Sequence, residues 1–207
     1  MGTRAEVLNV LHSGGVVILP TETVYGVAAR ADRPEAVNRL YAIKGRDFDK
    51  PLALCVSGMD AAKNYVTFDR LAKRLAKKFW PGPLTLVLPA RDPSLFTRLA
   101  PQLYSTAPDG TPTIAIRCPD AIWRTEITFA KIEYPVALTS ANRSGEPAPT
   151  QASQASKSLG YDVDDMLLLE DCPMEEASTI VSLAESPPRL LREGALPLSA
   201  LKPFGIT

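Results

Sequence analysis

The sequence predicts an α/β domain, because short apolar runs alternate along the chain with segments of helical periodicity. VVIL at 16–19 and LALCV at 52–56 have the length and composition of buried strands. Residues 69–79 repeat apolar side chains at helical spacing, and Lys73, Arg74, Lys77 and Lys78 fall largely on the opposite, solvated face. At 207 residues, 45% of them hydrophobic, the chain is long enough to bury a full core as one domain over 1–207.

The first predicted element is a helix with clear signals at both ends. Thr3 and Glu6 have the spacing of a capping box. The glycine pair at 14–15 ends the helix, and a strand is expected directly afterwards, at 16–20.

A second helix is predicted around Pro34, a residue that suits the first helical turn. Asp32 and Glu35 repeat the capping-box spacing, so Asp32 is expected to cap this helix. Its apolar face continues to about Lys44, and the strand at 52–56 follows.

The rest of the chain continues the alternation. WPGP at 80–83 predicts a sharp turn into the strand LTLVLP. Further strands are expected at 113–117, 136–140, 167–170, 179–183 and 189–192, with helices near 120–131 and 151–159.

Charge and cysteine usage exclude several classes of protein. The net charge is zero, yet residues 1–91 carry 14 Lys and Arg against 8 Asp and Glu, which suits a local anion pocket better than a long nucleic-acid footprint. Three cysteines without a CxxC pair and one histidine indicate neither a disulfide framework nor a metal site. A reduced, cytoplasmic protein without membrane association is therefore expected, since no apolar run approaches membrane-spanning length.

A basic loop follows the second predicted helix. Lys44, Arg46 and Lys50 lie in KGRDFDKPL, where a glycine and a proline disfavour regular structure. Such a cluster is a good cradle for a polyphosphate. The alternative is a solvated surface, which is what most runs of cations form.

Two strand ends favour the binding interpretation. PTETVYG at 20–26 and TSANRSG at 139–145 each place hydroxyl or amide groups directly after an apolar strand, where an open α/β sheet binds its ligands. Together with the basic loop, they are expected to form one site for an anionic substrate. GxxxxGK[ST] and GxGxxG are absent, so phosphates would be held by side chains and loop amides.

Six motifs of the sequence occur in the same order as in the YrdC-like threonylcarbamoyl-AMP synthases, which the chain resembles over about residues 5–196. They are PTETVYG, KGR…KPL, WPGPLTLVL, AIRCP, TSANRSG and STIV…LLREG. The resemblance implies a twisted, mixed β-sheet flanked by helices around a concave basic site. Because the chain stops near Thr207, it is similar to the short, single-domain members of the family.

The resemblance also implies an activity. L-threonine, bicarbonate and ATP, the last as its Mg²⁺ complex, would give threonylcarbamoyl-AMP and pyrophosphate, without a tightly bound cofactor or a protein-bound metal. The product would serve the threonylcarbamoyladenosine modification of tRNA beside the anticodon. Partner proteins are expected to transfer the threonylcarbamoyl group to tRNA.

Particular residues match the substrate-binding positions of the family. Those that match the ATP site are Lys44, Arg46, Lys50, Thr113, Asn142, Thr150 and Arg192. The first three would also offset charge on the leaving pyrophosphate, as the catalytic contribution of the protein. Those that match the L-threonine site are Tyr25, Cys55, Arg117, Ser140 and Ser178. Of these, Arg117 is expected to pair with the substrate carboxylate through its planar guanidinium.

Two positions depart from the family pattern. Asp47 stands where many members have a proline, and it either adds negative charge beside the basic loop or points to solvent. Cys55 stands where many members have a histidine that contacts threonine. A thiol cannot replace the hydrogen bonds of an imidazole, so an inert core role is favoured for Cys55.

Two other functions stay open. A basic concavity resembles a platform for double-stranded RNA, so a module that binds RNA or tRNA without synthase activity is one alternative, which the zero net charge disfavours. The other is a related carbamoyl-adenylate-forming enzyme of the kind found in hydrogenase maturation proteins. The acylphosphatase and zinc-finger-like segments of those proteins are missing from this sequence.

Overall fold

The structure is a computed structural model that describes residues 2–91, 99–120, 134–168 and 171–207. The strands are β1 Val17–Leu19, β2 Gly26–Arg30, β3 Ala53–Cys55, β4 Leu84–Pro89, β5 Tyr104–Thr106, β6 Pro112–Arg117, β7 Val136–Ser140, β8 Asp165–Met166, β9 Thr179–Ser182 and β10 Arg189–Arg192. The helices are α1 Arg4–His12, α2 Pro34–Lys44, α3 Met59–Ala62, α4 Arg70–Phe79, α5 Ala152–Leu159 and α6 Leu198–Leu201, with 3-10 turns at Pro101–Leu103 and Lys202–Phe204.

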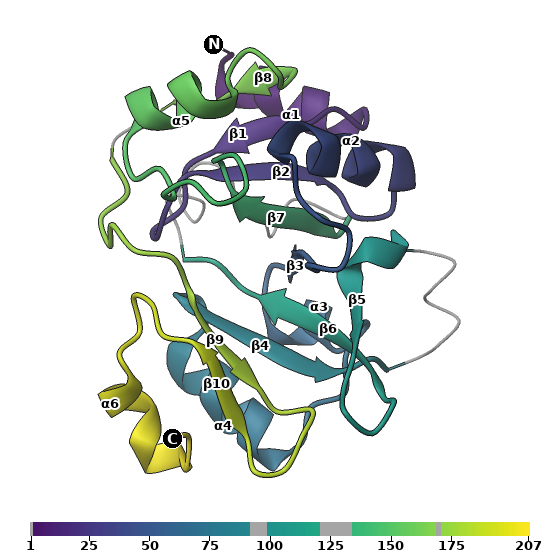
Figure 1. Cartoon of the computed structure of the whole chain (residues 1–207), viewed down its shortest axis with the longest axis vertical. Helices are drawn as coiled ribbons and strands as arrows, with labels where there is room; N and C mark the ends of the chain where they lie inside the picture. Colours follow the sequence, from purple (N-terminus) through teal and green to yellow (C-terminus); the bar gives the residue numbers. More distant parts are fainter. Residues whose placement is uncertain (1, 92–98, 121–133, 169–170) are drawn as a thin grey trace.

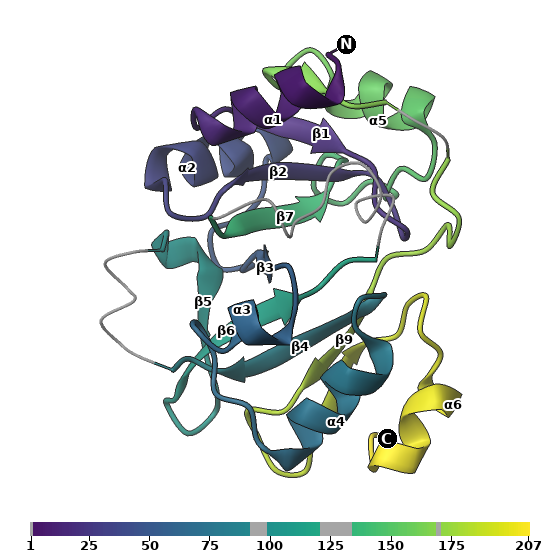
Figure 2. The same cartoon turned by 180° about the vertical axis from the view of Figure 1, so that it is seen from behind.

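The strands pair into one sheet in the order β10-β9-β4-β6-β3-β7-β2-β1-β8, and β5 pairs with β6. Neighbours run parallel in the pairs β1–β8, β3–β6 and β4–β9 and antiparallel in the others, so the sheet is mixed, as the family resemblance implies. Figures 1 and 2 show that the sheet twists strongly, with β1, β2, β7 and β8 in one half and β4, β6, β9 and β10 in the other. The short strand β3 joins the two halves, and the termini lie at opposite ends of the long axis.

One face of the sheet carries the main core. Alternate strand residues such as Ile18, Leu54 and Ile116 point to this face and pack with buried side chains of α2, α3 and α4. Ile18, Leu54 and Ile116 are fully shielded from water, and the cluster to which they belong contains most of the buried apolar side chains of the fold.

The opposite face is divided between the two halves. In the half that contains β1, β2 and β7, Val7 and Leu11 of α1 cover a smaller apolar cluster that includes Leu138 and Cys55. In the other half, the alternate residues of β4, β6 and β9 on this face are Thr85 and Val87, Ala115 and Arg117, and Ile180 and Ser182. A pocket forms where this part of the sheet face adjoins the smaller apolar cluster.

The helix starts agree with the sequence prediction at α1 and differ from it at α2. The capping box of Thr3 and Glu6 is present in full at α1. Asp69 caps α4, where Lys73, Arg74, Lys77 and Lys78 are exposed as expected. The cap at Asp32 is wrong, because Arg33 occupies that position and makes no side-chain cap. The Asp32 carboxylate instead accepts hydrogen bonds from Nε and Nη2 of Arg30 at 2.9 and 2.7 Å. This bidentate pair satisfies both carboxylate oxygens.

Several elements differ from the sequence prediction. The strand predicted at 167–170 lies earlier, as β8, because Asp165 and Met166 pair with β1. Residues 169–170 lie outside the described residues, as does the predicted helix near 120–131 except for its first residue. The strands β2 and β5 and the helices α3 and α6 were not predicted. At Gly26, which begins β2, a β-carbon would approach the Leu138 side chain to 2.8 Å, so the close pairing of β2 with β7 favours glycine there.

Candidate active site

A pocket opens where strand ends from both halves of the sheet meet. Three arginines line it, Arg46, Arg117 and Arg192, and its hydroxyl-bearing side chains are Thr21, Thr23, Thr85, Thr139, Ser140 and Ser178. No acidic side chain is among the described residues that line it. Guanidinium and hydroxyl groups without lining carboxylates favour ligands with carboxylate or phosphate oxygens.

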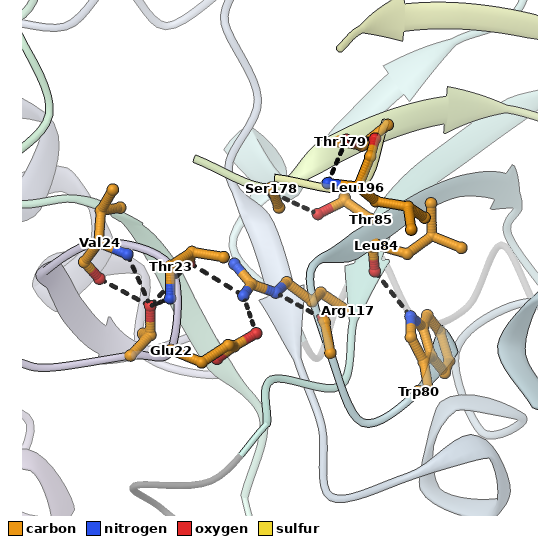
Figure 3. A network of polar contacts seen from close by, with 12 residues as sticks. Glu22, Thr23, Val24, Trp80, Leu84, Thr85, Arg117, Ser178, Thr179 and Leu196 are labelled. Atoms are coloured by element: carbon orange, nitrogen blue, oxygen red, sulfur yellow. Dashed lines mark hydrogen bonds and ion pairs between the residues drawn. The ribbon is translucent and has the colours of Figure 1, made fainter. Parts of the chain in front are cut away.

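Arg117, the last residue of β6, is held in the pocket wall by contacts from two separate segments. Its side chain is 7% exposed, and its Nε donates to the Gly82 carbonyl at 3.2 Å. Its Nη2 forms an ion pair with Oε1 of Glu22 and donates to Thr23 Oγ1 at 3.0 Å, as Figure 3 shows. The guanidinium therefore links β6 to the segment between β1 and β2.

Ser178 is held from two sides. Its hydroxyl lies 2.9 Å from the hydroxyl of Thr85, and its carbonyl accepts Nε and Nη2 of Arg192 at 3.0 and 2.7 Å (Figure 3 shows the first of these contacts). Although part of the Arg192 side chain reaches solvent, desolvation lowers its pKa, as do the positive charges of Arg117 and Arg46. The positive charges of Arg117 and Arg46 thus act on Arg192, as expected at a site for an anion.

The basic loop begins where α2 ends. Gly45 takes a left-handed conformation there, with φ of 58°, which turns the chain so that Arg46 lines the pocket. Arg46 is oriented by bonds from Nε and Nη2 to the carbonyls of Lys50 and Pro51, at 2.9 and 3.2 Å. Lys50 itself is exposed and pairs with Asp47 at 2.6 Å, so the Asp47 carboxylate is directed to Lys50 at the surface.

Lys44 has a different environment from the other two cations of the loop. It is 2% exposed, and its Nζ donates to the backbone carbonyls of Ser140 and Asn142, each at 2.5 Å. Burial, and next the positive charge of Arg46, lower the pKa of Lys44 to about 8. Lys44 does not line the pocket, but it ties the end of α2 to the segment that follows β7.

The other predicted site residues lie around the pocket rather than in its wall. Asn142 donates from Nδ2 to the Glu146 carbonyl at 2.7 Å, and its buried Oδ1 has no hydrogen-bond partner among the described residues. Thr150 lines a separate groove beside α5. Thr113 lies on the face of β6 that carries Arg117 and bonds the Ser105 hydroxyl at 2.7 Å, while Tyr25 belongs to the main core.

Cys55, at the end of β3, lines the pocket and is 1% exposed. Burial raises the pKa of its thiol to about 12, so the side chain stays neutral and unreactive near pH 7.

Within the described part of the chain, no three His, Cys, Asp or Glu side chains lie close enough to hold a metal ion. In the same residues no helix combines the length and apolar character needed to cross a membrane.

Two contributors to the site were not predicted as site residues. Thr85 could be recognised only from strand alternation, because it follows Leu84 and so faces away from the main core. Glu22 belongs to the PTETVYG segment that was expected near the site, but its ion pair with Arg117 joins residues 95 positions apart. Local sequence carries no signal for a contact of that kind.

The chain is similar in sequence to the members of one protein family. A model of the Sua5/YciO/YrdC family, described as telomere recombination, matches residues 9–194. The threonylcarbamoyl-AMP synthase of Pyrococcus abyssi is 35% identical over 196 residues, which cover 93% of this chain and 54% of that protein. A putative threonylcarbamoyl-AMP synthase of Methanocaldococcus jannaschii is 33% identical over 198 residues, which cover 96% of this chain and 86% of that protein. The chain thus spans about half the length of the first relative and most of the second.

Solved structures give the same relationship. P. abyssi Sua5 complexed with L-threonine superposes with a TM-score of 0.83 at 33% sequence identity, covering 95% of this chain and 55% of the other. E. coli YciO has a TM-score of 0.76 at 22% identity, covering 96% of this chain and 91% of the other, and supports the fold alone.

Proposed function

Because the chain belongs to the Sua5/YciO/YrdC family, we propose that it is a threonylcarbamoyl-AMP synthase, which converts L-threonine, bicarbonate and ATP to threonylcarbamoyl-AMP and pyrophosphate. The observation that carries the proposal is the convergence of Arg46, Arg117 and Arg192 on one pocket that Ser140 and Ser178 also line. A relative of 33% identity has been solved with L-threonine, which supports an amino acid as one substrate.

The reaction needs two bond-forming steps. The threonine nitrogen attacks the carbon of bicarbonate, and loss of water leaves a carbamate. A carbamate oxygen then attacks the α-phosphorus of ATP, and pyrophosphate departs with the electrons of the broken phosphorus–oxygen bond. Such transfers depend on positioning and on charge stabilisation more than on a dedicated base.

On the threonine side, Arg117 receives the substrate carboxylate. Its guanidinium lines the pocket while Nε and Nη2 are fixed by protein acceptors, and this restraint reduces the entropy lost on binding. Ser140 and Ser178 provide hydroxyl groups along the same wall, and Cys55 contributes shape rather than a strong hydrogen bond. Tyr25 supports this wall from the core behind it.

On the nucleotide side, Arg46 and Arg192 are the cations best placed for phosphate oxygens, because both line the pocket. Lys50 joins them if its side chain leaves Asp47, which an exposed pair allows at little cost. Lys44 acts by fixing the Ser140 and Asn142 backbone. Thr113, Asn142 and Thr150 complete the proposed ATP contacts, and Mg²⁺ enters with ATP as part of the substrate.

The proposal extends to the role of the product. A carbamoyl-adenylate is an activated acyl donor, and we propose that further proteins pass its threonylcarbamoyl group to tRNA, in the cytoplasm, for modification beside the anticodon. The continuous sheet supports residues 1–207 acting as one domain in this reaction. Direct binding of tRNA to the pocket region is expected to be weak, sensitive to salt and displaced by ATP.

The test is a measurement of pyrophosphate release from ATP. Release is expected only when L-threonine and bicarbonate are both present, together with an AMP-linked product detected by mass spectrometry. Omission of each substrate in turn is the control, and serine and valine replace threonine in parallel reactions. Release that does not depend on any amino acid, or no release with any of them, would refute the synthase assignment.

A further inference from the structure

We propose that Thr179 positions Arg192 for the nucleotide without touching the nucleotide itself. The inference rests on the proposed function and deepens it, since it adds a residue that holds one of the cations on the ATP side. Thr179 is the first residue of β9, and strand alternation places its side chain on the core face of the sheet, behind Ser178 and Ile180, which line the pocket. A role for Thr179 in binding must therefore act through a neighbour.

A β-bulge in β10 turns Arg192 toward the pocket. Leu190 pairs with Val181, and both pack in the main core, whereas Arg192 pairs with Ile180, and both line the pocket. Regular alternation would place residues 190 and 192 on the same face of the sheet. The extra residue between the two pairs, Leu191, reverses the direction of Arg192. That direction depends on how the chain is held on either side of the bulge.

The Thr179 hydroxyl holds the chain that follows the bulge. Its Oγ1 donates to the Leu196 carbonyl at 2.6 Å and accepts the backbone N–H groups of Gly194 and Leu196 at 2.9 and 3.2 Å. These three bonds form a hydroxyl clamp. Thr179 is fully buried, and Figure 3 shows its side chain in contact with Leu196. One hydroxyl therefore satisfies three backbone groups just after Arg192.

Two further contacts keep the same segments together. The Ala195 N–H donates to the Ala177 carbonyl at 2.9 Å. A β-carbon at Gly194 would clash with the Ala177 carbonyl oxygen, so the segment packs directly against the backbone before Ser178. The Ser178 carbonyl in turn accepts Nε and Nη2 of Arg192. The hydroxyl clamp thus fixes the guanidinium donor and its carbonyl acceptor relative to each other.

Loss of the hydroxyl clamp should affect the nucleotide through Arg192. Without the hydroxyl, two buried N–H groups and one carbonyl lose a partner, and the chain after the bulge must move to satisfy them. The Arg192 side chain is then less firmly held at the Ser178 carbonyl, and the entropy of ordering it is added to the cost of ATP binding. The hydroxyl clamp therefore preorganises the guanidinium for phosphate oxygens.

The experiment is a double-mutant cycle on the full chain, with a non-hydrolysable ATP analogue and Mg²⁺ as the ligand in calorimetric titrations. Thr179→Val keeps the shape and removes the hydroxyl, so affinity for the analogue should fall at least about fivefold. In the Arg192→Ala background the same substitution should change the affinity by less than about twofold, because the group through which it acts is gone. Equal losses in the two backgrounds, or no loss in either, would overturn the inference, since a general loss of structure does not depend on Arg192.

A conservative variant and a matched control accompany the cycle. Thr179→Ser keeps the hydroxyl and should bind the analogue within about twofold of wild type. Ser182→Ala removes a buried hydroxyl at the other end of β9, outside the hydroxyl clamp, and should also bind as wild type does. If either variant lost as much affinity as Thr179→Val, the loss would not come from the clamp and the inference would fail.

If Thr179→Val does not fold by circular dichroism, Gly194→Ala takes its place in the cycle. Its β-carbon forces the segment away from the Ala177 carbonyl while the Thr179 hydroxyl stays in place. The same pattern is expected, a loss of at least about fivefold alone and less than about twofold beside Arg192→Ala. Equal losses in the two backgrounds again contradict the inference.

These outcomes separate the inference from the proposed function. If wild-type protein binds the analogue and releases pyrophosphate but the losses are additive, the inference fails and the synthase assignment stands. The same holds if Arg192→Ala alone binds the analogue as tightly as wild type. If wild-type protein neither binds the analogue nor releases pyrophosphate, both fail.

Discussion

Thr85 on β4 and Ser178, next to the start of β9, share a hydrogen bond of 2.9 Å between their hydroxyl groups, and both side chains are buried in the pocket wall. The bond crosses from one strand to its parallel neighbour at the point where Arg192 holds the Ser178 carbonyl. A ligand that contacts the Ser178 hydroxyl therefore contacts a group whose orientation is set by its hydrogen bond to Thr85.

The first prediction concerns this pair. Thr85→Val keeps the shape but deletes the hydroxyl, so threonine affinity should fall roughly fivefold, in line with about 1 kcal/mol for one hydrogen bond. Thr85→Ser keeps the hydroxyl and should bind nearly as wild type does. Calorimetric titration of threonine measures both variants, and a loss in Thr85→Ser with none in Thr85→Val would mean that the methyl group, not the hydrogen bond, matters.

The second prediction separates the cations of the basic loop. Arg46→Ala should weaken ATP binding by roughly ten- to hundredfold, because the guanidinium lines the pocket and charge-assisted bonds are worth about 1.5–3 kcal/mol. Lys50→Ala should have a smaller effect, since Lys50 is exposed and paired with Asp47. ATP titrations compare the two variants, and a larger effect at Lys50 would show that its pair opens to bind phosphate.

Asp47 provides the matched control for that comparison. Asp47→Asn removes the surface ion pair and leaves Lys50 without its carboxylate partner. ATP affinity should then stay the same or rise, because a cation near the pocket is released. A loss of affinity would indicate that Asp47 orients the loop instead.

Particular residues show which parts of the fold the sequence alone predicts. Strand and helix positions with strong local signals, such as the capping box at Thr3 and the apolar run before Thr21, appear in the structure where they are expected. The strand Gly26–Arg30 was missed because glycine and alanine have low strand propensity, and it exists through pairing with β1 and β7 on either side.

The site residues, too, divide into those that sequence motifs identify and those whose environment only the structure reveals. Arg46, Arg117 and Arg192 could be proposed from motifs, and they do converge on one pocket. The burial of Lys44 could not be foreseen, because it depends on two carbonyls almost a hundred residues away in the chain. The partners of a charged side chain are set by tertiary packing, which no short pattern encodes.

The third prediction follows from the burial of Lys44. Its folded pKa of about 8 lies below the ordinary value of 10.5, so between these pH values the unfolded chain holds a proton that the folded chain has lost. The contribution of Lys44 to the free energy of unfolding should therefore rise with pH across this window, by roughly 3 kcal/mol at most. Below about pH 8 the contribution should be flat.

Lys44→Met is the variant that isolates this effect, because it keeps the apolar stem and removes the titrating group. Urea unfolding of both proteins near pH 7 and about pH 10 gives the change in unfolding free energy for each. The wild type should gain more stability, or lose less, than the variant over this interval. An identical pH dependence in the two proteins would mean that Lys44 keeps an ordinary pKa in the fold.

The last prediction compares Arg117 with Cys55 on the threonine side of the pocket. Arg117→Lys keeps the positive charge but loses the planar fork that reaches Gly82, Glu22 and Thr23 together, so threonine affinity should fall at least about tenfold. Cys55→Ala removes a neutral thiol and should change threonine affinity by less than about threefold. Calorimetric titration of threonine, with an ATP analogue bound, measures both on the same scale. If Cys55→Ala abolished binding while Arg117→Lys left it intact, the thiol would be the contact to threonine and Arg117 a support for Glu22.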